Sequence, residues 1–343
     1  MIWTSKSKQP PRIGIIGNGF VGGAVRNGFS PTVGCDATVR TYDKDPNKST
    51  HPLHTVVNKS DFIFISVPTP ANNDGTMNSE ILEQCISDIY TQCANGDAIF
   101  LIRSTVVPGT TRMIQEQYPD LPLVFNPEFL TERSANFDFI NQSRFVIGSS
   151  DAQYSNAVAD LYRWRFGRSS SILETNFESA EMIKYVTNTF FATKVSFLND
   201  MYLLSKETGA IWEDVVDGFV QDGRVGHSHL NVPGHDGKFG FGGSCFPKDI
   251  QALITFGELC GVSMDTLKGV WKTNLKVRPE RDWEQLKGRA VSEDLLLYSE
   301  ADEARMDIIG QNGNDGQHYD EVKHFADGFH EGEWEKDGET IKR

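Results

Sequence analysis

A glycine-rich turn near the start of the chain places the strongest constraint on its fold. The stretch Gly17-Asn18-Gly19-Phe20-Val21-Gly22 follows a short apolar segment, Arg12–Gly17, and precedes a segment with a helical pattern. In a strand–turn–helix unit of this kind, the glycines allow a tight turn and let a pyrophosphate approach the N-terminus of the helix. Glycine turns also occur in α/β folds that bind no ligand, so the surrounding sequence has to distinguish the two cases.

Asp43 favours the ligand-binding case. It follows a second apolar segment, Ala37–Tyr42, and stands 21 residues after Gly22. An acidic residue at this position accepts hydrogen bonds from the adenosine ribose of a dinucleotide and repels a 2′-phosphate. We therefore predict a site for NAD rather than NADP.

Short apolar strands alternate with helical segments over residues 12–150. Asp61–Val67 and Ala98–Ser104 are nearly continuous apolar runs, as expected for strands that are buried on both faces. Leu123–Asn126 and Arg144–Gly148 are predicted as two further strands. The alternation predicts an α/β class with a Rossmann-type, doubly wound parallel sheet.

The next part of the chain has a different pattern. Over Asn176–Thr208, apolar residues recur at intervals of three, four or seven without a proline, which predicts one long helix ending near Gly209. A loop is predicted over Gln221–Ser244, and two helices near Lys248–Cys260 and Met264–Leu286. The predicted domains are a NAD-binding domain (1–175), an all-helical central dimerisation domain (176–290) and an acidic tail, disordered or weakly helical (291–343).

Composition excludes several classes of function. The formal charge is −14, and residues 293–343 contribute −10 of it through 15 acidic and 5 basic residues. An acidic chain does not favour a nucleic-acid partner. No apolar run approaches the roughly 20 residues of a membrane span, and Met1–Pro10 lacks the apolar core of a signal peptide. These features predict a cytoplasmic protein that binds neither membrane nor nucleic acid.

The five cysteines do not form a disulfide pattern, but Cys245 has unusual neighbours. It lies in Gly242-Gly243-Ser244-Cys245-Phe246-Pro247-Lys248-Asp249, at the predicted start of a helix. A helix N-terminus and a nearby lysine lower the pKa of a thiol and favour the nucleophilic thiolate. Asp249 could orient or activate water. No metal is predicted, because the three histidines of the preceding loop lack a completing ligand set.

Four further stretches carry polar residues that would mean little alone. Val67-Pro68-Thr69-Pro70 and Arg103-Ser104-Thr105 stand at the ends of apolar strands, where open α/β sheets bind ligands. Glu128 and Glu132 follow another strand and could share one face of a helical turn. Lys184 and Asn188 are four residues apart on the long helix, so both could point into one cleft, where a lysine stabilises a developing oxyanion.

In this order, the segments resemble the UDP-glucose/GDP-mannose dehydrogenase family from about Arg12 to Trp283. The most specific parts are NPEFLTE from Asn126, AEMIKYVTN from Ala180 and FGGSCFPKD from Phe241. The resemblance implies a four-electron oxidation of the C6 alcohol of a nucleotide sugar, in the first place UDP-glucose, to a carboxylate with two NAD. Cys245 would hold the aldehyde as a thiohemiacetal and then as a thioester, which water hydrolyses.

The resemblance also implies roles for individual residues. Lys184 and Asn188 would hold the oxyanion, and Thr105, Glu132 and Asp249 would place or activate water. Arg224 would reach into the site of a neighbouring subunit, in a homodimer formed through the long helix. The implied NAD contacts are Gly17, Asn18, Gly19, Phe20, Val21, Asp43, Lys48, Thr69, Thr105, Glu132 and Lys248. The implied nucleotide-sugar contacts are Glu128, Phe129, Leu130, Thr131, Glu132, Lys184, Asn188, Arg224, Phe239, Gly240 and Gly242.

One departure from the family pattern leaves alternatives open. Family members usually carry a third, C-terminal nucleotide-binding domain, and nothing after Arg289 resembles one. The sequence therefore admits an active dehydrogenase for UDP-glucose, one for GDP-mannose or a UDP-N-acetylhexosamine, or a non-catalytic NAD-binding protein. The intact set of Cys245, Lys184, Asn188 and Asp249 favours an enzyme.

Overall fold

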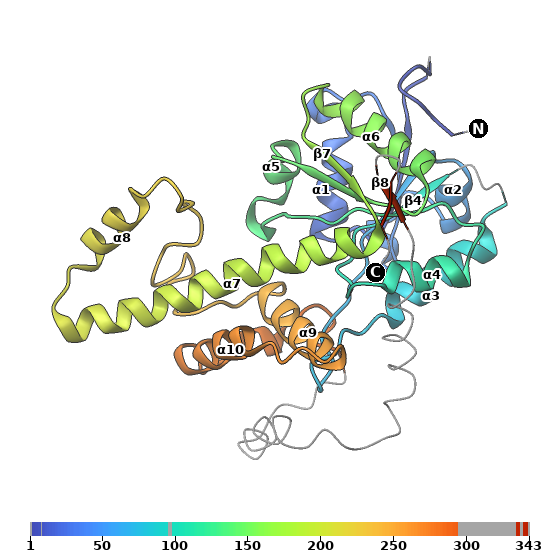
Figure 1. Ribbon diagram of the computed structural model, residues 1–343. Helices are drawn as coiled ribbons and strands as arrows, with labels where there is room; N and C mark the ends of the chain where they lie inside the picture. Colours follow the sequence, from blue (N-terminus) through green and yellow to red (C-terminus); the bar gives the residue numbers. More distant parts are fainter. Residues whose placement is uncertain (1, 8, 95–97, 294–333, 337–338, 342–343) are drawn as a thin grey trace. The chain divides into compact units, whose positions relative to one another are not determined.

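The computed structural model describes residues 2–7, 9–94, 98–293, 334–336 and 339–341 (Figure 1). The chain divides into two compact units: residues 1–70 with 77–190, and residues 71–76 with 191–343. The division at residue 190 falls within the long helix. The domain limits predicted from the sequence stay predictions, because a compact unit need not coincide with a domain.

The first unit is built on a seven-stranded sheet with the strand order β2-β1-β3-β4-β5-β6-β7. Neighbouring strands pair in parallel, except that β5 and β6 pair antiparallel through Phe125 and Gly148. The predicted α/β class with a doubly wound, largely parallel sheet is thus confirmed. The strands are β1 (Arg12–Ile16), β2 (Thr38–Tyr42), β3 (Phe62–Ile65), β4 (Ile99–Ile102), β5 (Leu123–Phe125), β6 (Phe145–Gly148) and β7 (Ile172–Thr175).

Each face of this sheet has its own apolar core. Along β3, Phe62 and Phe64 belong to one core and Ile63 and Ile65 to the other, as the two-residue period of a strand requires. Helices α1, α5 and α6 cover the first face, and α2, α3 and α4 the second (Figure 1). Their bounds are α1 (Phe20–Gly28), α2 (Leu53–Asn58), α3 (Glu80–Gln92), α4 (Thr110–Gln117), α5 (Ala135–Ile140) and α6 (Ala152–Phe166).

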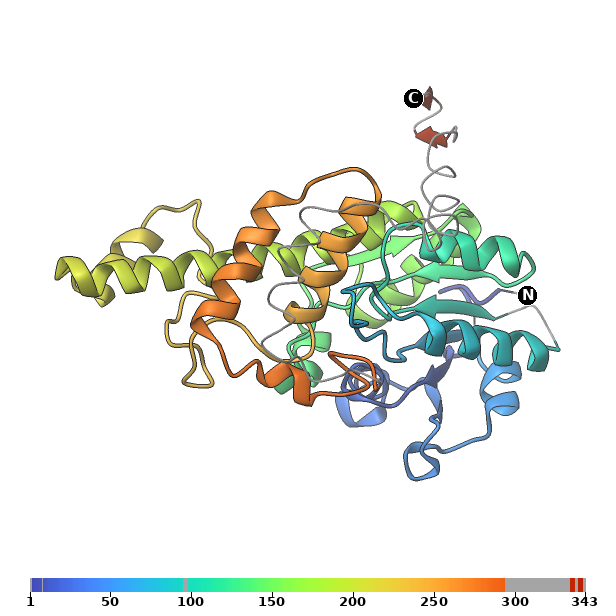
Figure 2. The same ribbon diagram turned by 90° about the horizontal axis from the view of Figure 1, so that it is seen from below.

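The long helix α7 extends over Phe177–Thr208, as the apolar period predicts, and Gly209 follows it with a left-handed φ of 72°. The rest of the second unit is helical: α8 (Trp212–Val220), α9 (Phe246–Leu259), α10 (Asp265–Val277) and a short 3₁₀ helix, Asp282–Gln285. Figure 2 shows α9 and α10 side by side. Their shared core includes Phe241, Ile250, Trp271 and Trp283.

Several details differ from the predictions. Helix α10 ends at Val277, before the predicted Leu286, because Pro279 disfavours the helical conformation at Arg278. The sequence analysis did not predict β7 or α8. Most of the predicted acidic tail lies outside the described residues, although two short antiparallel strands, β8 (Trp334–Lys336) and β9 (Glu339–Ile341), are described there. None of the described helices combines the length and apolarity that crossing a membrane requires.

Candidate active site

The glycine-rich turn between β1 and α1 has the geometry that close approach of a ligand requires. Gly17 has φ of +85°, and a Cβ there would lie 2.5 Å from the carbonyl oxygen of Ser66. A Cβ at Gly22 would lie 1.9 Å from the carbonyl oxygen of Gly17, whereas one at Gly19 would meet nothing within 4 Å. No side chain caps the N-terminus of α1. The turn therefore presents backbone N–H groups beside open space, which suits a pyrophosphate.

Asp43 is held against this turn at the carboxyl end of β2. Its Oδ2 accepts a hydrogen bond from the backbone N–H of Asn18 at 2.6 Å, and its Oδ1 accepts one from Asp45 at 2.9 Å. The side chain of Asn18 donates to the carbonyl oxygen of Lys48 at 2.9 Å. The predicted cofactor residues Asn18, Asp43 and Lys48 are thus brought together, and Phe20 and Val21 begin α1 beside them.

The ends of β3 and β4 are joined by buried polar side chains. Thr69 donates from Oγ1 to the carbonyl oxygen of Thr105 at 2.7 Å. Ser104 donates to the carbonyl oxygen of Val67 at 2.7 Å and accepts from its N–H at 3.1 Å. These neighbouring strands end at the same edge of the sheet, so the two predicted cofactor contacts, Thr69 and Thr105, are neighbours in space.

A buried ion pair joins the stretch after β5 to α7. Lys184 donates from Nζ to Oε1 of Glu128 at 2.8 Å and to the carbonyl oxygen of Glu128 at 2.6 Å. The other carboxylate oxygen accepts from the N–H of Leu130 at 2.7 Å. Burial alone would raise the pKa of Glu128, but the charge and hydrogen bond of Lys184, with the hydrogen bond from Leu130 and the charge of Arg103, together outweigh it, so the pKa lies below its usual value.

The ring of Phe129 lies close to two cations of this unit. The guanidinium of Arg144 is 4.1 Å from the centre of its ring, and the Nζ of Lys184 is 5.6 Å from it. Asn188, one turn after Lys184, is also buried. In contrast, Thr131 and Glu132 are exposed at the 3₁₀ turn Glu132–Ser134, where the N–H of Thr131 donates to Asp138.

Asn126 is fixed by hydrogen bonds to side chains and backbone that the sequence analysis did not connect with it. Its Oδ1 accepts from Nη1 of Arg103 at 2.6 Å and from the hydroxyl of Tyr162, and its Nδ2 donates to the carbonyl oxygen of Val146 at 2.7 Å. Burial raises the pKa of Tyr162 to about 12, so the hydroxyl remains a donor. These contacts anchor the first residue of the NPEFLTE stretch, although no local pattern connects Tyr162 with it.

Cys245 occupies the N-cap position of α9 in the second unit, and no side chain caps that helix end. The helix N-terminus favours negative charge on its Sγ. Ser244 contributes its hydroxyl 3.8 Å from that Sγ. Within the first turn, Lys248 pairs with the buried Asp249 at 2.5 Å. The start of α9 thus brings together Cys245, the predicted nucleophile, Asp249, the carboxylate predicted to activate water, and Lys248.

The predicted substrate residues of the second unit lie in two places. Phe239, Gly240 and Gly242 belong to the loop that leads into Cys245, and Gly240 has φ of +65°. Arg224 lies nearer the start of the same connection between α8 and α9, with 90% of its side chain exposed and an ion pair to Asp222 at 2.5 Å. In the part of the chain that the structure describes, no three His, Cys, Asp or Glu side chains are grouped as a metal site.

The fold and the turn geometry define the first unit as a dinucleotide-binding α/β domain, and comparisons with known proteins agree. Residues 40–165 match the NAD binding domain of the UDP-glucose/GDP-mannose dehydrogenase family, and residues 178–276 match its central domain. The chain therefore belongs to the UDP-glucose/GDP-mannose dehydrogenase family, a family of nucleotide-sugar dehydrogenases.

Individual relatives support the same conclusion. UDP-glucose 6-dehydrogenase TuaD of Bacillus subtilis is 35% identical over 237 residues, which are 67% of this chain and 49% of the relative. A UDP-glucose dehydrogenase structure from Pyrobaculum islandicum is similar with a TM-score of 0.70 and 28% identity, over 79% of this chain and 69% of that one. A GDP-mannose dehydrogenase structure from Pseudomonas aeruginosa gives 0.57 and 26%, over 80% and 71%. The chain spans about half the length of the curated relatives it matches.

Proposed function

We propose that this chain oxidises the C6 alcohol of UDP-glucose to the carboxylate of UDP-glucuronate, using two NAD. The observation that carries the proposal is Cys245 at the uncapped start of α9, with the Lys248–Asp249 pair in the following turn. A plain alcohol dehydrogenase needs no nucleophile, whereas oxidation to the acid proceeds through addition of a nucleophile to the aldehyde carbon, and a thiolate is well suited to that addition. The identity of 35% to UDP-glucose 6-dehydrogenase TuaD favours UDP-glucose as the sugar nucleotide.

The chemistry assigned to Cys245 balances in four steps. The first oxidation removes a hydride from C6 and a proton from its hydroxyl, leaving an aldehyde. The thiolate adds to the aldehyde carbon and the oxygen takes up a proton, which gives a thiohemiacetal. Loss of a second hydride and of that proton gives a thioester. Water then attacks the thioester carbon, the thiolate leaves, and the carboxylate and the two protons of the water are released.

The remaining proposed catalytic residues stabilise the negative charge of the intermediates or place the hydrolytic water. We assign Lys184 and Asn188 to the oxygen that becomes negative in each addition, since a buried ammonium stabilises an oxyanion strongly. Thr105, Glu132 and Asp249 are assigned to the placement and deprotonation of the hydrolytic water. Glu128, held by Lys184, and the residues Phe129–Thr131 are assigned to the nucleotide sugar.

The residues of the first unit fit NAD. NAD supplies the acceptor for the hydride in each oxidation. The open space at Gly19, the uncapped start of α1 and the anchored carboxylate of Asp43 suit a pyrophosphate followed by a ribose. Lys48, Thr69 and Lys248 are the further contacts that we assign to it.

Product analysis of Cys245→Ser tests the proposal. We expect wild-type chain to release NADH and UDP-glucuronate, and the variant to form no acid, because a serine hydroxyl is far less ionised than a thiol and traps the aldehyde poorly. Mass spectrometry identifies the products, and circular dichroism confirms that the variant is folded. Uronate formation by the variant would remove Cys245 from the mechanism.

A panel of nucleotide sugars tests the substrate. UDP-glucose is expected to give the highest kcat/KM among UDP-glucose, GDP-mannose and UDP-N-acetylglucosamine. A preference for another nucleotide sugar of the panel would replace UDP-glucose as the proposed substrate but leave the proposed reaction unchanged. No NADH from any of them, with NAD still bound, would leave only an NAD-binding role.

We also propose that the chain works as a homodimer through α7, with Arg224 contributing to the site of the partner subunit. The exposed apolar residues of α7 support the interface, and the high exposure of Arg224 leaves its side chain accessible to a second copy.

A further inference from the structure

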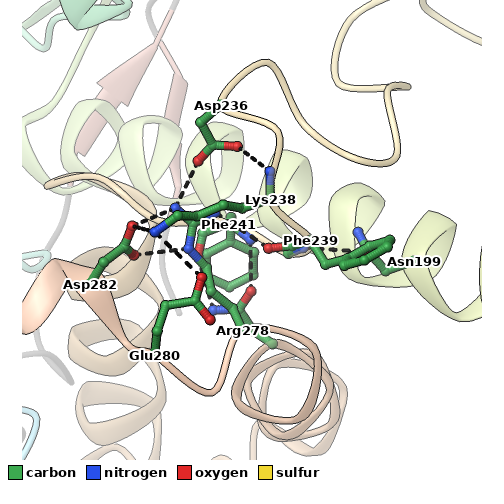
Figure 3. Close-up of polar contacts among 10 residues, drawn as sticks. Asn199, Asp236, Lys238, Phe239, Phe241, Arg278, Glu280 and Asp282 are labelled. Atoms are coloured by element: carbon green, nitrogen blue, oxygen red, sulfur yellow. Dashed lines mark hydrogen bonds and ion pairs between the residues drawn. The ribbon is translucent and has the colours of Figure 1, made fainter.

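Arg278 lies behind the loop that leads into Cys245. Its side chain is only 3% exposed, yet it follows the end of α10 and carries a full positive charge. Its Nε and Nη2 donate to the two carboxylate oxygens of Asp282 at 2.9 and 2.7 Å (Figure 3). Nη2 also donates to Asp236 at 2.7 Å, and Nη1 donates to the carbonyl oxygen of Phe239 at 3.3 Å. The guanidinium of Arg278 thus binds the loop both at the side chain of Asp236 and at the backbone of Phe239.

Two asparagines hold the next residues of the same loop. Asn274, fully buried one turn before Arg278, accepts from the N–H of Phe241 at 2.7 Å and donates to its carbonyl oxygen at 3.0 Å. Asn199 of α7 accepts from the N–H of Gly240 at 3.1 Å. The backbone from Phe239 to Phe241 is therefore fixed by side chains of other elements, since it lies in neither a helix nor a strand.

Two glycines of the loop allow its backbone to lie in close contact with these side chains. A Cβ at Gly240 would lie 2.4 Å from Oδ1 of Asn274, and one at Gly242 would lie 2.6 Å from Nη2 of Arg278. Backbone and side chains therefore approach more closely than any other residue at these two positions would allow. A lysine in place of Arg278 could not reproduce the contact, because it lacks the planar fork that serves two carboxylates and a carbonyl at once.

The charges around Arg278 are balanced by ionised carboxylates. Hydrogen bonding to Arg278 lowers the pKa of Asp282 to about 2. Burial would raise the pKa of Asp236, but the hydrogen bond to Arg278, the backbone hydrogen bonds and the charge of Arg278 together outweigh burial and lower it. Lys238, from the loop itself, pairs with Asp282 at 2.8 Å and with Glu280 at 3.4 Å. The cluster therefore stays charged at neutral pH, and a buried guanidinium so paired is costly to disturb.

We infer that Arg278 and Asn274 are positioning residues for Cys245. They fix the backbone of the loop up to Phe241, four residues before the cysteine, and so set where its thiol stands. Only the catalytic consequence of this inference rests on the proposed function. The positioning itself is a property of the folded chain and can be measured without turnover.

Alkylation of the full chain by iodoacetamide measures the positioning directly. We expect Arg278→Lys and Asp236→Asn to change the alkylation rate of Cys245 by at least about threefold, because the accessibility of a thiolate controls its reaction rate. Asp236→Asn removes one carboxylate and keeps the Arg278–Asp282 pair, so it tests the loop if Arg278→Lys fails to fold. Lys276→Ala is the matched control, because Lys276 is exposed and lies two residues before Arg278 at the end of α10. The exposed Cys260 is an internal reference, read from its own peptide by mass spectrometry.

The ratio of NADH to UDP-glucuronate measures the catalytic consequence. A misplaced thiol traps the aldehyde poorly, so the ratio is expected to rise above about two in Arg278→Lys and to stay at two in Lys276→Ala. An unchanged alkylation rate in both folded variants overturns the inference, whatever the activity. A changed rate with an unchanged ratio overturns the positioning role in catalysis. A changed rate in a chain whose wild type makes no NADH supports the positioning and refutes the proposed dehydrogenase.

Discussion

At the scale of single residues, the buried pair of Glu128 and Lys184 is the most demanding feature of the first unit. Both side chains are nearly inaccessible to solvent, at 6% and 3% exposure. A charge in such a place is tolerated only when its partner is present, because desolvation of an isolated ion costs several kcal/mol. The pair therefore does two things: it joins the stretch after β5 to α7, and it keeps an ammonium inside the proposed site.

Removal of one partner should show this cost. We expect Glu128→Ala and Lys184→Ala each to lower the free energy of unfolding by about 3–5 kcal/mol, and the double variant to lose less than the sum of the two. Urea denaturation measures the three values. The control is Glu178→Ala, which breaks the more exposed pair with Arg112 and should cost at most about 1 kcal/mol. Additive losses would show that the two charges do not depend on each other.

Asp43 determines the choice of cofactor in our interpretation. We expect the chain to bind NAD at least about tenfold more tightly than NADP, a ratio that needs only about 1.4 kcal/mol of repulsion between the carboxylate and a 2′-phosphate. Asp43→Asn should narrow the ratio, since an amide oxygen can still accept from Asn18 but carries no charge. Calorimetric titration with both cofactors measures it. Equal affinities in the wild type would contradict the assignment.

At the scale of elements, Glu181 connects α7 with α4. Its two carboxylate oxygens accept from the N–H groups of Gly109 and Thr111, at 2.6 and 2.8 Å, so a residue of one helix caps another. Burial raises the pKa of Glu181 to about 8, although these two hydrogen bonds oppose the shift. The connection is therefore sensitive to pH.

The pH dependence of stability should reveal this group. Because the pKa is raised from 4.5 to about 8 in the folded state, the native chain binds the extra proton between these values. Stability from this group is present below pH 4.5 and is lost as pH rises through 8. Relative to Glu181→Gln, which does not titrate, the wild type should lose at least about 1 kcal/mol over that window. Urea denaturation at several pH values measures the difference, and a constant difference would show that Glu181 stays ionised.

Local patterns predicted most of the elements, and the failures have identifiable causes. The segments that form β3 and β4 are apolar throughout, so their burial on both faces could be predicted from the sequence. Strand β7 has two exposed residues, Glu174 among them, and gives no such signal. The antiparallel pairing of β5 with β6 depends on how the chain returns to the sheet, which no local period encodes.

The candidate site was predictable only where a motif carries it. The cysteine at the start of α9 and the glycine turn before α1 depend on short-range geometry, which residue types at fixed spacing reveal. Arg278 and Asn274 act on a loop more than 30 residues earlier in the chain, and Tyr162 acts on Asn126 across 36 residues. Such contacts arise from tertiary packing, and nothing in the local sequence distinguishes these side chains from ordinary helical ones.

At the scale of the whole molecule, the family motifs are divided between the two compact units. The NAD-type turn, Glu128 and Lys184 belong to the first, and Cys245 and Asp249 to the second. Residues 71–76 follow the strand-end motif of the first unit but pack in the second, where Ala71 accepts from Ser292 at 2.8 Å. The proposed reaction therefore needs both units, and neither carries the full set of proposed catalytic residues.

Helix α7 carries an apolar face that the described residues of the chain leave exposed. Val186, Phe197 and Leu204 are 56%, 52% and 54% exposed, and their spacing of seven or eleven residues places them on one side of the helix. Such a stripe is costly in water and is typical of an interface between subunits. Pairing with a second copy about a two-fold axis would bury it with the commonest oligomer symmetry.

We therefore expect a dimer whose activity depends on assembly. Light scattering should give twice the chain mass of 38.3 kDa. Val186→Asp combined with Phe197→Asp should give monomers, because two carboxylates would be buried at the interface, whereas Glu207→Lys, exposed on the same helix, should leave the dimer intact. Arg224→Ala should keep the dimer and reduce kcat/KM for UDP-glucose by about tenfold or more, as loss of one charged contact predicts. A fully active monomer would contradict both the interface and the role of Arg224, because each requires a second copy of the chain.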